Sequence, residues 1–315
     1  IVMLLMLPLL GTMILAGCGT RQSVDTVRLK SRLFDAVKVI GGRGTGLGQF
    51  IKPRSVAVDR QDNLYVADIT GRVQKFSSNG VFLSFWQMPQ TDLGKPKGMG
   101  RDSMGNIIVV EPHYSRVNHF TTAGKLVAQW GKPGTSPGEL AFPRAVAVNS
   151  SGEILVSEYG KAERVQRFSA LGKRFLGSFG HAGSGPGEFN RAEGLAIDAA
   201  DRIYVADSCN HRVQVFSPDG RFLRSYGQAG SGLGELSYPY DICVDPAGRQ
   251  YVCEFGNSRV QVFDAQDRQL EVLGAPGSDP GQFGNPWSLA LDSAGNLYVA
   301  DSGNNRVQKF LRRPR

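Results

Sequence analysis

Six acidic residues each precede an arginine by four to six positions. The pairs are Asp68 and Arg72, Glu111 and Arg116, Glu158 and Arg164, Asp207 and Arg212, Glu254 and Arg259, and Asp301 and Arg306. A carboxylate and a guanidinium at this separation can pair across a short turn. Because a catalytic group is needed once and this arrangement recurs six times, we expect the pairs to be structural.

A second set of positions is the better candidate for ligand binding, because its members differ from one copy to the next. Each member follows a proline, or Ala192 in one copy, and the set is Arg54, Lys97, Arg144, Glu193, Tyr240 and Trp287, with Asp241 beside Tyr240. Three consecutive members are basic and the others are acidic or aromatic, which suits a sugar, an anionic polymer or a partner's loop. The alternative is that these side chains only fill space between structural units or are solvated at a rim.

The same residues leave an enzymatic alternative open. In a lyase or hydrolase, Glu193 or Asp241 would serve as general acid or base, and Arg144 or Arg54 would stabilise an oxyanion. The histidines, at positions 113, 119, 181 and 211, do not form a set, and glycine runs such as 183–187 lack the Gly-Lys-Ser/Thr of a phosphate loop. We therefore predict no metal and no cofactor.

The elements that position these residues follow from an internal repeat. The phrase Arg-Val-x-x-Phe recurs, and its successive valines are separated by 44, 48, 48, 47 and 47 residues. Such a period indicates a repeat architecture. In the copy over residues 195–227, four strand-like segments alternate with short turns, which predicts an antiparallel meander. Since the inner strands are apolar on both faces, the copies must stack, and we predict an all-β, six-bladed β-propeller of four-stranded blades.

The ends of the chain are predicted to close this ring. After Phe310 only five residues remain, too few apolar ones for a fourth strand, whereas residues 34–40 (Phe-Asp-Ala-Val-Lys-Val-Ile) form a strand-like segment without a blade of its own. We expect residues 34–40 to complete the last blade. The variable positions then start the innermost strands, at the mouth of the central channel. Cys243 and Cys253 would lie on neighbouring strands, either as a disulfide or as two buried thiols.

Three segments carry a family resemblance. Asn210-His-Arg-Val, Asn257-Ser-Arg-Val and Asn304-Asn-Arg-Val, each preceded by Tyr-Val and an acid, resemble NHL repeats. The resemblance covers residues 34–310 and implies the propeller fold, whereas similar propellers serve as lyases, sensor domains, protein scaffolds and RNA binders. Peptide-amidating lyases of similar fold place metal-binding histidines after the inner-strand proline, where this chain has none, so the resemblance does not imply a zinc site.

The first residues predict export. Residues 1–17 are almost wholly apolar and end in Leu15-Ala-Gly before Cys18, which is typical of a secretory signal. Leu-Ala-Gly-Cys resembles the bacterial lipobox, which implies a lipidated Cys18, then a basic tether over 18–33 and the propeller over 34–315. An uncleaved anchor is the alternative. Either way we expect a membrane-held, extracytoplasmic domain in the cell envelope, and Gly19 in place of aspartate implies the outer membrane if the cell has two.

The net charge of +8 favours anionic surroundings but does not choose among them. Nucleic-acid binding conflicts with export. The sequence therefore predicts a binding or scaffold module that engages a protein or polysaccharide partner through its channel face, with the lyase or hydrolase as the alternative.

Overall fold

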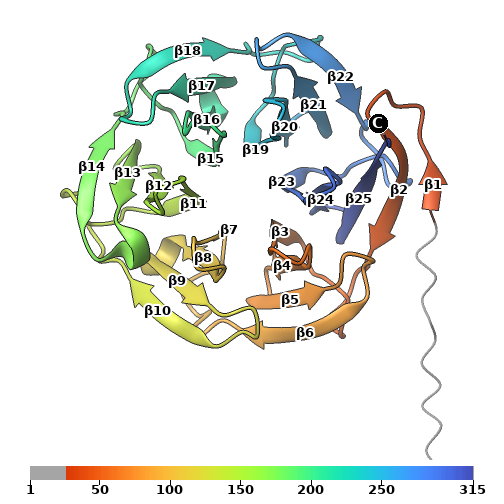
Figure 1. Cartoon of the computed structure of the whole chain (residues 1–315), viewed down its shortest axis with the longest axis horizontal. Helices are drawn as coiled ribbons and strands as arrows, with labels where there is room; N and C mark the ends of the chain where they lie inside the picture. Colours follow the sequence, from red (N-terminus) through yellow and green to blue (C-terminus); the bar gives the residue numbers. More distant parts are fainter. Residues whose placement is uncertain (1–25, 315) are drawn as a thin grey trace, which may run out of the picture.

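The computed structural model describes residues 26–314, which form a ring of six antiparallel sheets around a central channel (Figure 1). Five sheets contain four strands and the sixth contains five. The predicted all-β, six-bladed propeller is therefore confirmed. The predicted signal at 1–17 and Cys18 lie outside the described residues.

Each blade runs from an innermost strand at the channel to an outermost strand at the rim, and only the sixth blade takes strands from both ends of the chain (Figure 1). From the channel outward, blades one to three contain β3 (Pro53–Val58), β4 (Leu64–Asp68), β5 (Arg72–Phe76) and β6 (Phe82–Gln87); β7 (Gly98–Arg101), β8 (Ile107–Glu111), β9 (Arg116–Phe120) and β10 (Leu126–Trp130); and β11 (Pro143–Val148), β12 (Ile154–Glu158), β13 (Arg164–Phe168) and β14 (Phe175–Phe179). Blades four to six contain β15 (Ala192–Ile197), β16 (Ile203–Asp207), β17 (Arg212–Phe216) and β18 (Phe222–Tyr226); β19 (Pro239–Val244), β20 (Gln250–Glu254), β21 (Arg259–Phe263) and β22 (Gln269–Leu273); and β23 (Pro286–Leu291), β24 (Leu297–Asp301), β25 (Arg306–Arg312), β2 (Phe34–Ile40) and β1 (Thr26–Arg28). Single 3-10 turns occur at η1 (Pro112–Tyr114), η2 (Ala170–Gly172) and η3 (Ser208–Asn210).

The core lies between the blades. The second strand of every blade is buried over its whole length, as in β4, because each blade covers both faces of its neighbours. Val66 of blade one and Tyr298 of blade six, for example, belong to one apolar cluster. The buried tyrosines keep a polar partner, since the Tyr65 hydroxyl donates to Asp59 at 2.9 Å.

The ring is closed by β2, as the sequence predicts. β2 pairs antiparallel with β25 from Phe34 opposite Arg312 to Ile40 opposite Val307. The residues just after Phe310 also contribute, because β25 continues through Arg312. β1 then pairs with β2 as a fifth strand, so part of the segment predicted to be a tether is a strand.

The recurring acid and arginine hold the connectors between blades. In blade four, Arg212 donates to Asp207 at 2.8 Å and to the carbonyls of Ser184, Gly185 and Glu188 at 2.7, 2.7 and 2.9 Å. Gln214, which is fully buried, donates to the Glu188 carbonyl at 2.6 Å. Each connector of this kind also carries a parallel bridge, at residues 43 and 50, 133 and 140, 182 and 189, 229 and 236, and 276 and 283. We call the acid, arginine and glutamine together the connector clamp.

Phe34 tests the closure of the ring. Its side chain is fully buried and its ring centroid lies 6.3 Å from that of Tyr251 in blade five and 5.8 Å from that of Phe310. Phe34→Ala should lower the free energy of unfolding by about 3–4 kcal/mol in urea titrations, because it leaves a cavity where β2 meets two blades. Phe85→Ala, at a residue that is 49% exposed on β6, should cost less than about 1 kcal/mol. Equal losses in the two variants would contradict the role of β2.

Candidate functional site

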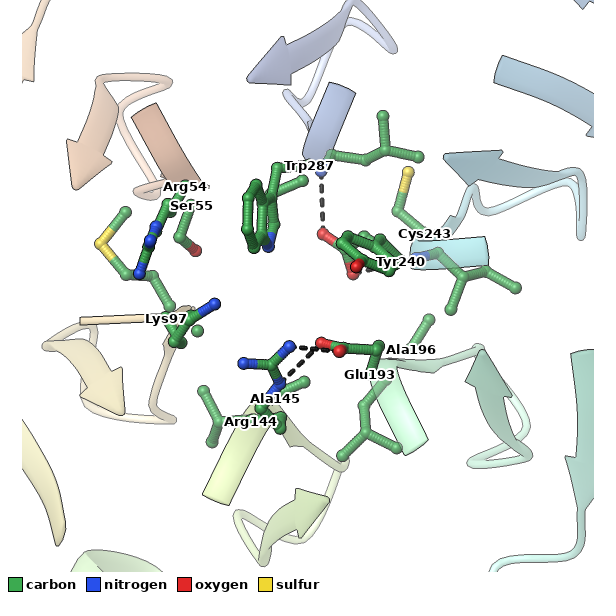
Figure 2. A pocket seen from close by; sticks show the side chains of 18 of the residues that line it. Arg54, Ser55, Lys97, Arg144, Ala145, Glu193, Ala196, Tyr240, Cys243 and Trp287 are labelled. Atoms are coloured by element: carbon green, nitrogen blue, oxygen red, sulfur yellow. Dashed lines mark hydrogen bonds and ion pairs between the residues drawn. The ribbon is translucent and has the colours of Figure 1, made fainter. Parts of the chain in front are cut away.

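All six variable positions meet at the mouth of the central channel. One cavity of about 360 Å³ is lined by Arg54, Lys97, Arg144, Glu193, Tyr240 and Trp287 (Figure 2). Asp241 lines it as well. They converge because each lies in the first two residues of an innermost strand or, for Lys97, directly before it, and the six innermost strands surround the channel (Figure 1).

The basic side of the mouth contains two cations that lack a carboxylate partner among residues 26–314. The Lys97 Nζ lies 4.3 Å and the Arg54 Cζ lies 5.1 Å from the centroid of the Trp287 ring. The Arg54 Nε is buried and has no hydrogen-bond partner within the described residues. Burial, followed by the charges of Arg144 and Arg54, lowers the pKa of Lys97 to about 6. Burial and then the charge of Arg144 also lower the pKa of Arg54.

The third basic residue is neutralised by its neighbour. Arg144 and Glu193 form a buried two-pronged ion pair, with Nε at 2.7 Å from one carboxylate oxygen and Nη2 in contact with the other. Arg191 reaches the same carboxylate through its Nε at 2.5 Å. Glu193 is therefore held between two guanidinium groups, and both of its carboxylate oxygens are already hydrogen-bonded within the protein.

Arg191 comes from a ring of backbone positions that the sequence did not reveal. In five blades the residue just before the inner-strand proline, or before Ala192, has a positive φ: Lys52 at 46°, Phe142 at 52°, Arg191 at 68°, Tyr238 at 46° and Asn285 at 51°. This left-handed conformation costs a residue other than glycine about 1 kcal/mol or more. Its repetition around the mouth shows that the connector imposes it, and in blade four it places Arg191 beside Glu193.

Aromatic rings form the wall next to these cations. Tyr240 stacks on Phe255 with centroids 4.5 Å apart, and Trp287 lies 5.3 Å from Tyr240 and 5.7 Å from Phe255. Tyr159 lies under the Arg144 guanidinium at 4.6 Å. Sequence reasoning missed Phe255 and Tyr159, although both directly follow a clamp acid, where the other copies have Ile69, Pro112, Ser208 and Ser302.

Asp241 occupies the next level of the channel, where the other blades have small residues: Ser55, Gly98, Ala145, Gly194 and Ser288. Its two carboxylate oxygens accept the backbone N–H groups of Ile242 and Leu289, each at 2.9 Å. A Cβ on Gly194 would come within 2.6 Å of the Asp241 Cα, so glycine is needed there. Burial raises the pKa of Asp241 to about 6, even though its side chain keeps some exposure to the channel.

The residues predicted to form structural pairs are all paired. The six contacts measure 3.3 Å for Asp68 and Arg72, 2.6 Å for Glu111 and Arg116, 2.7 Å for Glu158 and Arg164, 2.8 Å for Asp207 and Arg212, 2.6 Å for Glu254 and Arg259, and 2.7 Å for Asp301 and Arg306. They lie in the blades and connectors and do not line the cavity.

The cysteines and histidines stay apart. Cys209, Cys243 and Cys253 are free, and Cys253 lies opposite Asp241 rather than opposite Cys243 in the strand register. His119 is buried within blade two, where Trp130 donates to its Nε2 at 3.0 Å and its Nδ1 lies 3.0 Å from Asp102. Within residues 26–314 no group of three or more His, Cys, Asp or Glu side chains is arranged to hold a metal ion.

In the same part of the chain, no helix is both long and apolar enough to cross a membrane.

Comparison with known proteins shows NHL repeats. The model of the NHL repeat matches residues 189–216, 236–263 and 283–310, which contain the three inner strands of blades four, five and six. Among curated proteins, NHL repeat-containing protein 3 of Mus musculus is 30% identical over 182 residues, which is 52% of this chain and 51% of the relative. Protein brain tumor of Drosophila melanogaster is 26% identical over 175 residues, which is 55% of this chain and 15% of the relative. The chain thus spans about half, or less, of the length of these relatives.

Solved structures share the fold. A gluconolactonase from Xanthomonas campestris superposes with a TM-score of 0.69 at 15% identity, covering 93% of this chain and 99% of that one. A streptogramin B lyase superposes with a TM-score of 0.61 at 10% identity, covering 88% of this chain and 98% of that one. At such low identity the similarity concerns the propeller architecture alone.

The unusual pKa of Lys97 predicts a pH-dependent stability. An unfolded lysine keeps its proton up to about pH 10.4, whereas folded Lys97 releases it above about pH 6. Because the unfolded chain binds more protons between these values, the contribution of Lys97 to stability should rise with pH across that window. Lys97→Met should therefore be more stable than the wild type by on the order of 2 kcal/mol at pH 6, and the difference should shrink towards pH 10 in urea titrations.

Lys125→Met is the matched control, because Lys125 is an exposed lysine outside the channel. It should leave the pH dependence of the wild type unchanged. A difference between Lys97→Met and the wild type that stays constant from pH 6 to pH 10 would show that Lys97 has an ordinary pKa.

Proposed function

We propose that this propeller is a binding module that receives a segment of a partner protein at its channel mouth. The observation that carries the proposal is the composition of the mouth. In an otherwise repetitive ring, the residue type at this one position changes from blade to blade, and the six side chains combine basic, acidic and aromatic groups around one cavity. Aromatic and arginine side chains supply most of the binding energy at protein interfaces. The likeness to NHL repeats is consistent with this function.

The shape of the site favours a narrow segment. A cavity of about 360 Å³ is near the lower end of the range for ligand pockets, and six blades surround it on all sides (Figure 1). A side chain, a chain end or a tight loop can enter such an opening, whereas an extended strand has no open groove in which to lie. In the blades other than blade two, connector clamps fix the starts of the strands that carry these wall residues.

The enzymatic alternative now rests on Asp241. Its pKa of about 6 would let it exchange a proton near neutral pH, and it lines the same cavity as the six variable positions. Glu193 is less suited to that role because two arginines hold its carboxylate. Binding and catalysis are distinguished by asking whether a bound peptide is chemically changed.

Trp287 and Tyr240 test the binding site. Peptides selected from a displayed library against the wild type should bind Trp287→Ala and Tyr240→Ala about 30-fold more weakly in calorimetric titrations, because each change removes an aromatic surface at the centre of the mouth. Phe85→Ala, an exposed aromatic residue on the outer strand β6, is the control and should bind like the wild type.

The outcomes separate the alternatives. Unchanged affinity in both channel variants would exclude the mouth as the binding site. Conversion of a bound peptide by the wild type, lost in Asp241→Asn, would support the lyase or hydrolase instead. A selection that yields only peptides whose binding depends on the outer rim would also contradict the proposal.

We also propose that Cys18 carries a lipid that holds the propeller outside the cytoplasm, at a bacterial envelope membrane. The support is the apolar run of residues 1–17 and the Leu-Ala-Gly-Cys sequence that ends it. In a bacterial host, metabolic labelling with an alkyne fatty acid should mark the wild type and not Cys18→Ser, which should be released from the membrane fraction. Cys209→Ser is the control, and an unlabelled wild type would contradict the proposal.

A further inference from the structure

The charges of the channel mouth do not balance. Arg144 and Arg191 share the carboxylate of Glu193, so each of them has an acidic partner within the protein. Arg54 and Lys97 have no such partner among the described residues, and both lie against one ring, that of Trp287 (Figure 2). Asp241 does not compensate them, because its oxygens accept backbone N–H groups of blades five and six. Arg54 and Lys97 are both partly buried, and holding two neighbouring charges there without an anion from the described residues is costly unless something else supplies the negative charge.

We infer that Arg54 and Lys97 bind the carboxylate of a peptide that enters the channel end-on, with the apolar atoms next to that carboxylate packed on Trp287 and Tyr240. This inference rests on the proposed function and adds the chemical class of the group that is recognised. A guanidinium presents paired N–H donors that match the two oxygens of a carboxylate, and the buried Arg54 Nε is a donor without an acceptor among residues 26–314. The adjoining ring of Trp287 offers an apolar surface. Its centroid lies 5.3 Å from the centroid of the Tyr240 ring.

The geometry of the ring limits the source of the carboxylate. Because the mouth is closed all round, the carboxylate must come from a free C-terminus or from an Asp or Glu side chain that projects into the channel. Both sources present the same group, and amidated peptides distinguish them.

Anion binding here should be linked to a proton. The groups that act on Lys97 are Arg54 from blade one, Arg144 from blade three, and Arg191 and Glu193 from blade four; the arginines disfavour its charged form and Glu193 favours it. A bound carboxylate adds to the effect of Glu193 and favours protonated Lys97. Affinity should therefore fall as pH rises above about 6, by up to about tenfold per pH unit, since the proton must be taken up on binding.

The experiment uses the whole propeller and four probes: N-acetyl-Ala-Phe with a free carboxylate, the same dipeptide as its amide, N-acetyl-Phe-Glu amide, and inorganic phosphate. Binding is followed by the fluorescence of Trp287, one of the three tryptophans of the chain, and assigned with Trp287→Phe. We expect at least one carboxylate peptide to bind, and the uncharged amide to bind at least about tenfold more weakly. The free acid and the Glu peptide then identify the source of the carboxylate.

The variants test the two cations separately. Arg54→Met and Lys97→Met should each weaken binding of the carboxylate peptide by about tenfold or more. Lys97→Arg should retain the affinity but lose the pH dependence between pH 6 and 8, which a merely structural role would not predict. Lys125→Met is the control for loss of one positive charge. Melting curves of every variant show whether the propeller is intact, and both methionine variants remove a partly buried charge, so we expect them to fold.

Equal binding of the acid and the amide, no binding of any peptide, or binding of phosphate alone would overturn the inference. If library peptides bind in a Trp287-dependent manner but are indifferent to Arg54 and Lys97, the inference fails while the proposed function stands. If no peptide depends on Trp287 or Tyr240, both fail.

Discussion

The connector clamp is the interaction on which the rest of the structure depends. In blade four the Asp207 carboxylate accepts the N–H of Asn190 while Arg212 binds the carbonyl of Glu188, so both sides of this stretch of the connector are fixed. The next residues are Arg191, Ala192 and Glu193. The clamp thus determines where the innermost strand begins and which side chain reaches the channel mouth. A buried carboxylate and guanidinium are tolerated because each is satisfied by hydrogen bonds to the backbone as well as by the other.

Blade two shows what happens where the clamp is incomplete. Its connector lacks the glycine run, and Glu111 is bonded only to Arg116 and Asn118, while its second oxygen is buried without a partner among residues 26–314. Arg116 turns to the side chain of Gln90 instead of to a row of carbonyls. The inner strand of this blade starts two residues later, at Gly98 rather than at Pro96, and Lys97 is held by its N–H bond to the Val110 carbonyl at 3.0 Å. One of the two uncompensated cations therefore comes from the one blade that departs from the pattern.

Much of this could be predicted from the sequence because repetition makes local features visible. The repeat period of the Arg-Val-x-x-Phe phrase predicted the six blades. The strand-like segment 34–40, which had no blade of its own, predicted how the ring closes. The position at which the residue type differs among the copies predicted the residues at the channel mouth. The buried glutamines such as Gln214 recur at the same period and could have been predicted in the same way. The pairing of Arg144 with Glu193 could not be predicted, because it joins residues 49 positions apart and depends on how two side chains meet across blades. Arg191 was hidden because its place at the mouth follows from a left-handed backbone conformation, not from any spacing.

The chemistry of the channel follows from an asymmetry in how its charges are satisfied. Glu193 accepts hydrogen bonds from two arginines, and Asp241 accepts hydrogen bonds from backbone N–H groups. Arg54 and Lys97, in contrast, lie against the face of the Trp287 ring. A ring face attracts a cation but cannot accept the strong, directional hydrogen bonds that a guanidinium and an ammonium offer. The acids of the channel are therefore occupied, and the unfilled bonding capacity lies with the cations. A ligand gains most by filling what the protein leaves unfilled, which is why we propose an anionic ligand for a mouth whose own carboxylates are already used.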